Sequence, residues 1–166
     1  MVRVLIGGAL VAILAVSSDA CSRRPPESRI RTVEARIDGI TCPTCVPPLH
    51  DSLKRQYKQS AIDVSDEKDT ATVRFSEHED FSLSEFRAAV ERVRMRVVAL
   101  HLEACGIVEM SNGEKWLTAG ANRFVVKSDG ELPLNQPLCA AGGLDSRSNP
   151  PVFYVSRFTA QGAPGS

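Results

Sequence analysis

The apolar residues between positions 32 and 104 switch between two spacings, and the order of these spacings limits the fold more than any other feature. Strict alternation of apolar and polar residues predicts a half-buried strand, whereas apolar residues every three or four positions predict an amphipathic helix. The segment shows strand, helix, strand, strand, helix and strand patterns in turn. The expected strands cover 32–38, 60–65, 70–76 and 96–103, and the expected helices cover 47–57 and 82–93.

This order is that of a ferredoxin-like βαββαβ domain of the α+β class, which we expect over residues 32–104. Such a domain packs both helices on one face of a four-stranded antiparallel sheet. Ser82 and Glu85 form a capping box, which predicts that the second helix begins there. In the last strand, the alternation predicts that Val98, Leu100 and Leu102 lie on the inner face.

The sequence changes character after Cys105. Short apolar segments alternate with turn signals such as Ser-Asn-Gly-Glu and Ser-Asp-Gly-Glu, and no helical period is visible. We expect a small all-β unit of about five strands over residues 105–160, a barrel or sandwich of the OB-like kind. Trp116 and Phe124 are expected in its core, and residues 161–166 are expected to be a disordered tail.

The first 31 residues predict export. Arg3 precedes the apolar run at 4–16, and small residues follow, so residues 1–20 have the pattern of a secretory signal peptide. Ser18-Asp19-Ala20-Cys21 also resembles a bacterial lipobox, with serine where the family has leucine. The expected location is therefore the periplasm or cell envelope, with a lipid on Cys21 or with simple cleavage before it. Residues 21–31 are polar and proline-bearing, which is typical of a tether.

The charge balance argues against nucleic acid as a partner. The chain has 20 basic and 20 acidic residues, whereas phosphate binding needs a basic surface. Aromatic residues are 5% of the chain, too few for a platform that stacks bases.

The residues GITCPTCVPP carry the candidate site. Cys42 and Cys45 lie between the first expected strand and the first expected helix, a position that suits a metal clamp, a redox dithiol or a disulfide. Proline is tolerated only in the first helical turn, so Pro47 and Pro48 place the start of the helix near Val46 or Pro47. Both cysteines then precede the helix, and the prolines withdraw two N–H groups from its N-terminus.

Gly39–Cys45 resembles the Gly-Met-Thr-Cys-x-x-Cys signature of the heavy-metal-associated domain family, which includes copper chaperones and periplasmic mercury-binding proteins. The resemblance covers residues 32–104 and implies that Cys42 and Cys45 bind a soft ion, Cu(I) or Hg(II). It implies a carrier and not an enzyme, with a membrane metal transporter or another thiol-bearing protein as partner. Ile40 replaces the methionine of the signature, and Arg94-Met95 replaces Gly-Tyr or Gly-Phe, so Met95 is expected near the loop.

The chemistry of the residues favours the same ion class. Thiolates select soft ions, and two of them are enough for a linear two-coordinate ion, whereas Zn(II) normally takes four ligands. His50 does not share the helical face of Cys45, and His101 has the parity of the open face of the sheet. The acidic segment 77–80 is expected to be a solvated connector.

Two other interpretations remain open for the dithiol. Cys-Pro-x-Cys before a helix also occurs in thiol-disulfide redox proteins, and an exported Cys42–Cys45 pair could be oxidised in a structural or interaction domain. Cys105 and Cys139 are separate from this motif and are a possible structural disulfide.

Overall fold

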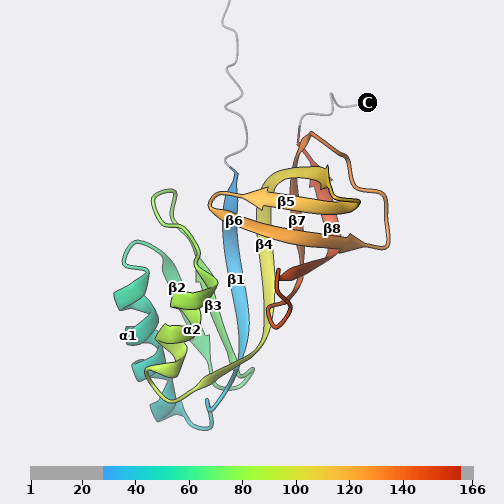
Figure 1. Cartoon of the computed structure of the whole chain (residues 1–166). Coiled ribbons are helices and arrows are strands. Elements are labelled where there is room, and N and C mark those ends of the chain that lie inside the picture. Colours follow the sequence, from blue (N-terminus) through green and yellow to red (C-terminus); the bar gives the residue numbers. More distant parts are fainter. Residues whose placement is uncertain (1–27, 162–166) are drawn as a thin grey trace, which may run out of the picture.

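The computed structural model describes residues 28–161, which form an α+β structure with one mixed eight-stranded sheet and two α-helices (Figure 1). The expected signal peptide 1–20, Cys21, and residues 22–27 and 162–166 lie outside the described residues. The elements are β1 (Arg29–Asp38), η1 (Pro43–Cys45), α1 (Val46–Gln56), β2 (Ala61–Ser65), β3 (Thr70–Arg74), α2 (Leu83–Glu91), β4 (Arg96–Ser111), β5 (Glu114–Ala119), β6 (Asn122–Ser128), β7 (Pro137–Asp145) and β8 (Val152–Ala160).

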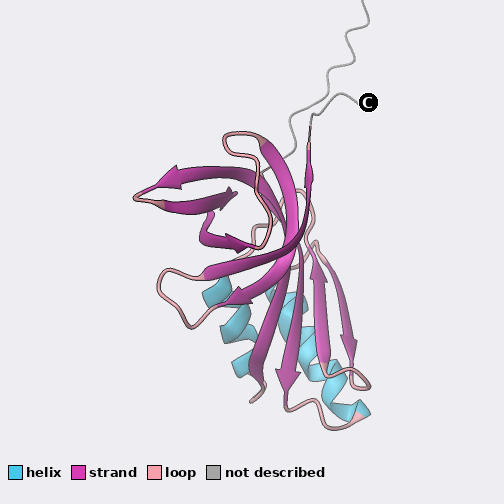
Figure 2. Cartoon of the chain, turned by 90° about the vertical axis from the view of Figure 1, so that its right-hand side faces the viewer, coloured by secondary structure: helices cyan, strands magenta, loops and turns pink. Residues whose placement is uncertain are grey.

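The first six elements other than η1 follow the expected order of strand, helix, strand, strand, helix and strand. Their strands lie in the order β2-β3-β1-β4, and each neighbouring pair is antiparallel. Both helices lie against one face of this part of the sheet (Figure 2). This packing explains the alternation of apolar and polar residues in β1, because Val33, Ala35 and Ile37 are at most 1% exposed beneath the helices.

Strand β1 begins three residues earlier than the sequence pattern predicted, so residues 29–31 of the expected tether are part of the sheet. Ile30 is 2% exposed and pairs with Ala104, and a bulge at Arg31 keeps both Ile30 and Val33 directed to the core. The alternation of apolar and polar residues is interrupted at this bulge, so the sequence pattern placed the start of β1 at Thr32 instead of Arg29.

The predicted inward position of Val98 is wrong. The pairing between β1 and β4 shifts between Arg36/Ala99 and Ile37/Val97, so Val98 is the extra residue of a β-bulge. Val98 is therefore 36% exposed, and its neighbour Val97 packs against the core instead. Leu100 and Leu102 lie beyond the bulge and are buried as expected.

The five apolar segments after residue 104 are strands, and their pairings close into a ring. The ring runs β4-β5-β6-β8-β7, and β7 pairs again with β4. Only the β6–β8 pairing is parallel among the described strands, which makes the sheet mixed. A β-carbon at Gly142 would lie 1.9 Å from the Tyr154 carbonyl oxygen, so only glycine allows β7 and β8 to approach this closely.

Strand β4 belongs to both halves of the structure. Residues 96–105 pair with β1, residues 100–107 pair with β7, and residues 107–111 pair with β5. The strand passes the expected domain boundary at 104/105 without a break, and Figure 1 shows it running from the helical half into the ring. The buried residues of both halves also form one hydrophobic cluster.

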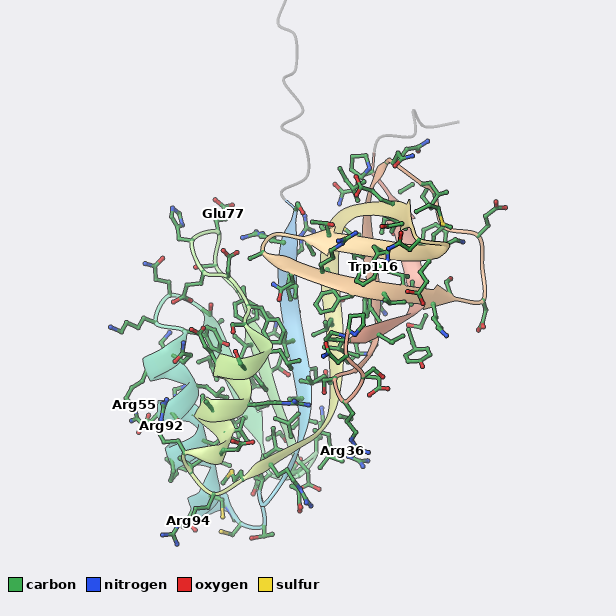
Figure 3. The ribbon with its side chains drawn as sticks, viewed as in Figure 1. Arg36, Arg55, Glu77, Arg92, Arg94 and Trp116 are labelled. Carbon is green, nitrogen blue, oxygen red and sulfur yellow. A yellow bond between two sulfur atoms is a disulfide. The ribbon has the colours of Figure 1, made fainter. Side chains whose placement is uncertain are left out.

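A disulfide joins two of the ring strands. Cys105 on β4 and Cys139 on β7 face each other in the ladder, and their sulfurs are bonded at 2.04 Å. Phe124 is buried in the ring beside Phe153, as expected of a core residue. Trp116, which is labelled in Figure 3, is only half-buried, and the Arg123 guanidinium lies 4.5 Å from the centroid of its ring.

No helix within residues 28–161 is both long and apolar enough to cross a membrane.

Candidate functional site: the thiol loop

The loop that carries the two cysteines begins at the end of β1. Gly39 has a φ of 108°, a conformation that side chains disfavour, and it turns the chain out of the strand. Arg96 donates to the Asp38 carboxylate at 2.6 Å, which pairs the end of β1 with the start of β4. Met95 fills the space under the turn, because a β-carbon at Gly39 would lie 3.2 Å from its Cγ.

Met95 is 8% exposed, so it packs beneath the loop, where the sequence led us to expect it. The residue before it, Arg94, has a φ of +62° at the end of the turn that follows α2. Figure 3 places Arg94 at the lower end of the molecule, the end at which β1 leads into the thiol loop. A left-handed residue at this position turns the chain back toward the sheet and presents Met95 to Gly39.

A short 3-10 turn brings the two cysteines together. The Cys45 N–H donates to the Cys42 carbonyl oxygen at 2.9 Å, and Pro43 occupies the first position of the turn. Helix α1 then begins at Val46, as the sequence predicted, with the two following prolines in its first turn. Both cysteines therefore precede the helix, on a backbone that the turn and the prolines restrict.

Both thiols are free, and their surroundings differ. The Cys42 sulfur lies 3.0 Å from the Thr44 hydroxyl, whereas the Cys45 sulfur lies 4.0 Å from the Thr41 hydroxyl. Cys45 also packs against the hydrophobic core. Each cysteine is half-buried, so neither residue is enclosed in the core.

The loop lowers the pKa of the Cys42 thiol below its ordinary value. The largest cause is the hydrogen bond from the Cys45 side chain, followed by that from the Thr44 side chain, and burial acts in the opposite direction. The backbone groups of Cys45 and Thr44 also contribute to the lowering. The groups that lower this pKa belong to the turn between the two cysteines. They precede Pro47 and Pro48, so the N–H groups that these prolines lack are not among them.

The histidines considered as extra ligands lie elsewhere. His50 is on α1, where its Nδ1 lies 3.5 Å from Asp51 Oδ1, and His101 is exposed on β4 opposite Glu34. Within residues 28–161 no group of three or more histidine, cysteine, aspartate or glutamate side chains is placed to hold a metal ion. The site that the described residues offer is the pair Cys42 and Cys45.

The segment 77–80 does more than connect two elements. Glu77 is exposed at its tip (Figure 3), but Glu79 reaches back and accepts hydrogen bonds from the Ser60 hydroxyl and, at 2.9 Å, from the Gln59 N–H. Partial burial raises the pKa of Glu79, and these hydrogen bonds lower it by more, so the net pKa lies below the ordinary value. The sequence signal for a solvated loop was correct for Glu77 and wrong for Glu79.

The sequence reasoning also missed the role of Thr44. It was treated as one of the two variable residues between the cysteines, and only the position of its hydroxyl beside Cys42 singles it out. A hydroxyl between two thiols is a signal that could have been used, because threonine can donate to a nearby sulfur.

Comparison of the chain with protein-family models, with curated proteins and with solved structures finds no match.

Proposed function

We propose that residues 32–104 form a ferredoxin-like domain of the heavy-metal-associated type and that the remaining strands complete a small OB-like barrel. The strand order β2-β3-β1-β4, with both helices on one face, supports the first part. The closed ring of pairings from β4 to β7 supports the second. The two units share β4, so the boundary between them falls within a strand.

In this proposal the protein is an exported carrier that holds a soft ion, Cu(I) or Hg(II), between Cys42 and Cys45. The observation that carries it is the pair of free, half-buried thiols in one turn, at the end of a loop fixed by Gly39 and Met95. Thiolate sulfur prefers soft ions, and two sulfurs satisfy a linear ion. The ion is cargo, so no catalytic residue is assigned.

Transfer would proceed by exchange of thiolate ligands. The two thiols lose their protons to solvent as the ion binds, because the thiolate is the ligand. A thiolate of the partner then forms a third bond to the ion, and the bonds to Cys42 and Cys45 break in turn. Both cysteines are only half-buried, which leaves room for the incoming ligand, and low coordination keeps the exchange fast.

The proposed location is the periplasm or cell envelope, with a lipid on Cys21. The proposed partner is a membrane metal transporter or another protein with free thiols. Both follow from the sequence pattern of residues 1–21 and from the chemistry of ligand exchange.

Native mass spectrometry under anaerobic conditions tests the function. The reduced protein is mixed in turn with Cu(I), Hg(II) and Zn(II), and the expected result is a tight one-to-one complex with Cu(I) or Hg(II). The matched variants are Cys42→Ser/Cys45→Ser, which should bind none, and Cys105→Ala/Cys139→Ala, which should bind as the parent does. Equal binding by the parent and the Cys42/Cys45 variant would contradict the proposal.

A thiol-disulfide redox function is the second candidate, and the lowered pKa of Cys42 favours it, because a thiolate is the attacking species in disulfide exchange. The measurement is the reduction potential of the Cys42–Cys45 couple against glutathione. A potential within the oxidoreductase range, together with no binding of soft ions, would favour this function over the carrier.

A further inference from the structure

The two sulfurs of the thiol loop are held by different means. Cys45 packs against the hydrophobic core, and this packing limits its motion. Within residues 28–161, Cys42 is not one of the residues that pack against that core, and its sulfur lies 3.0 Å from the Thr44 hydroxyl. The position of Cys42 therefore depends on a polar contact instead of on packing.

The backbone fixes where the Thr44 hydroxyl lies. Pro43 restricts its own φ, and the Cys45 N–H bond to the Cys42 carbonyl closes the turn around Thr44. Threonine is β-branched, so its first side-chain torsion is stiff. Thr44 is exposed, and its hydroxyl lies 3.0 Å from the Cys42 sulfur.

We propose that Thr44 is a positioning residue: its hydroxyl holds the Cys42 sulfur toward Cys45, so that the pair is arranged for a soft two-coordinate ion before the ion arrives. This inference rests on the proposed carrier function. A thiolate that binds one ion keeps lone pairs that accept a hydrogen bond, so the Thr44 contact persists in the loaded protein. Groups that orient a metal ligand in this way typically change metal affinity by about 10- to 100-fold.

Thr41 provides the internal comparison. Its hydroxyl lies 4.0 Å from the Cys45 sulfur, at the outer limit for a hydrogen bond to sulfur, and Cys45 has its core contact in addition. Removal of the Thr41 hydroxyl should therefore matter less than removal of the Thr44 hydroxyl, although the two threonines flank the same dithiol.

The experiment compares Thr44→Val, Thr44→Ser and Thr41→Val in the reduced full chain without oxygen. Valine has nearly the shape of threonine and lacks the hydroxyl, whereas serine restores it. Competition with a chromophoric chelator measures the affinity for Hg(II) and Cu(I). The expected result is a loss of about tenfold for Thr44→Val, recovery in Thr44→Ser, and a smaller loss in Thr41→Val.

A second measurement does not involve the ion. NMR couplings report the first side-chain torsion of Cys42, which should occupy one rotamer in the parent and in Thr44→Ser and should average over several in Thr44→Val. Unchanged affinity together with an unchanged Cys42 rotamer in Thr44→Val would overturn the inference while leaving the carrier function standing. If the parent binds neither Cu(I) nor Hg(II), the carrier function is overturned. If the Cys42 rotamer nevertheless changes in Thr44→Val, the contact between Thr44 and Cys42 is shown independently of the ion.

Discussion

The loss of the Cys105–Cys139 disulfide should lower the free energy of unfolding by about 3.8 kcal/mol. The bond closes a loop between residues separated by 34 positions. The chain-entropy relation for such a loop gives roughly 12.6 cal/mol/K, or about 3.8 kcal/mol at 25 °C. The two residues already face each other in the ladder between β4 and β7, so the folded state needs little rearrangement without the bond.

The assay is urea unfolding of Cys105→Ala/Cys139→Ala, followed by the fluorescence of Trp116, the single tryptophan of the chain. Alanine is preferred to serine because Cys105 is 1% exposed, and a buried hydroxyl would add a cost of its own. The control is Cys42→Ala/Cys45→Ala, which keeps the disulfide and should change stability by less than about 1 kcal/mol. A loss below about 1 kcal/mol for the disulfide variant would refute the reasoning, since it would mean that the bond does not restrict the unfolded chain.

Three further predictions concern single side chains. Glu79→Gln should lower the free energy of unfolding by about 1 kcal/mol at pH 7. Because the pKa of Glu79 is lowered in the folded state, its stabilising contribution is complete above the unfolded pKa of about 4.3 and is lost as the pH falls through the folded pKa. Urea unfolding of the parent and the variant at pH 7 and at pH 3 measures this difference. Val97→Ala should cost about 1 kcal/mol and Val98→Ala less than about 0.5 kcal/mol, by urea unfolding, because the bulge directs only Val97 to the core. Cys45→Ala should raise the pKa of Cys42 and slow its alkylation by iodoacetamide at pH 7, because the variant lacks the Cys45 side-chain hydrogen bond that lowers this pKa most.

Each of these has an outcome that contradicts it. A Glu79→Gln deficit that stays constant between pH 7 and pH 3 would mean that ionisation of Glu79 does not stabilise the fold. Equal losses at Val97 and Val98 would argue against the bulge. An alkylation profile of Cys42 that is unchanged in Cys45→Ala would show that its acidity comes from elsewhere in the loop.

Local sequence signals predicted the elements that depend on neighbours in the chain. The alternation of Val33, Ala35 and Ile37 reflects one strand face against the core, and Ser82 accepts a hydrogen bond from the Glu85 N–H as the capping pattern requires. The prolines after Cys45 fixed the start of α1, because proline cannot donate within a helix.

Features that depend on strand pairing were not predictable from the sequence. The bulges at Arg31 and Val98 follow from the register between β1 and β4, which no local pattern encodes. The contact between Glu79 and Ser60 joins two loops that are distant in sequence. At the candidate site, the spacing of the cysteines identified Cys42 and Cys45. The hydrogen-bond partner of Cys42, the Thr44 hydroxyl, depends on the conformation of the turn, which the spacing does not specify.

The shared strand β4 has a practical consequence for fragments of this protein. A fragment that stops at residue 104 would retain the thiol loop but would lose β7, the partner of β4 along residues 100–104. The unpaired backbone groups of that stretch would become an open sheet edge, and such an edge promotes association between copies. Metal-binding studies on the excised helical half would then report on an aggregating species, so the intact chain is the proper material for work on Cys42 and Cys45.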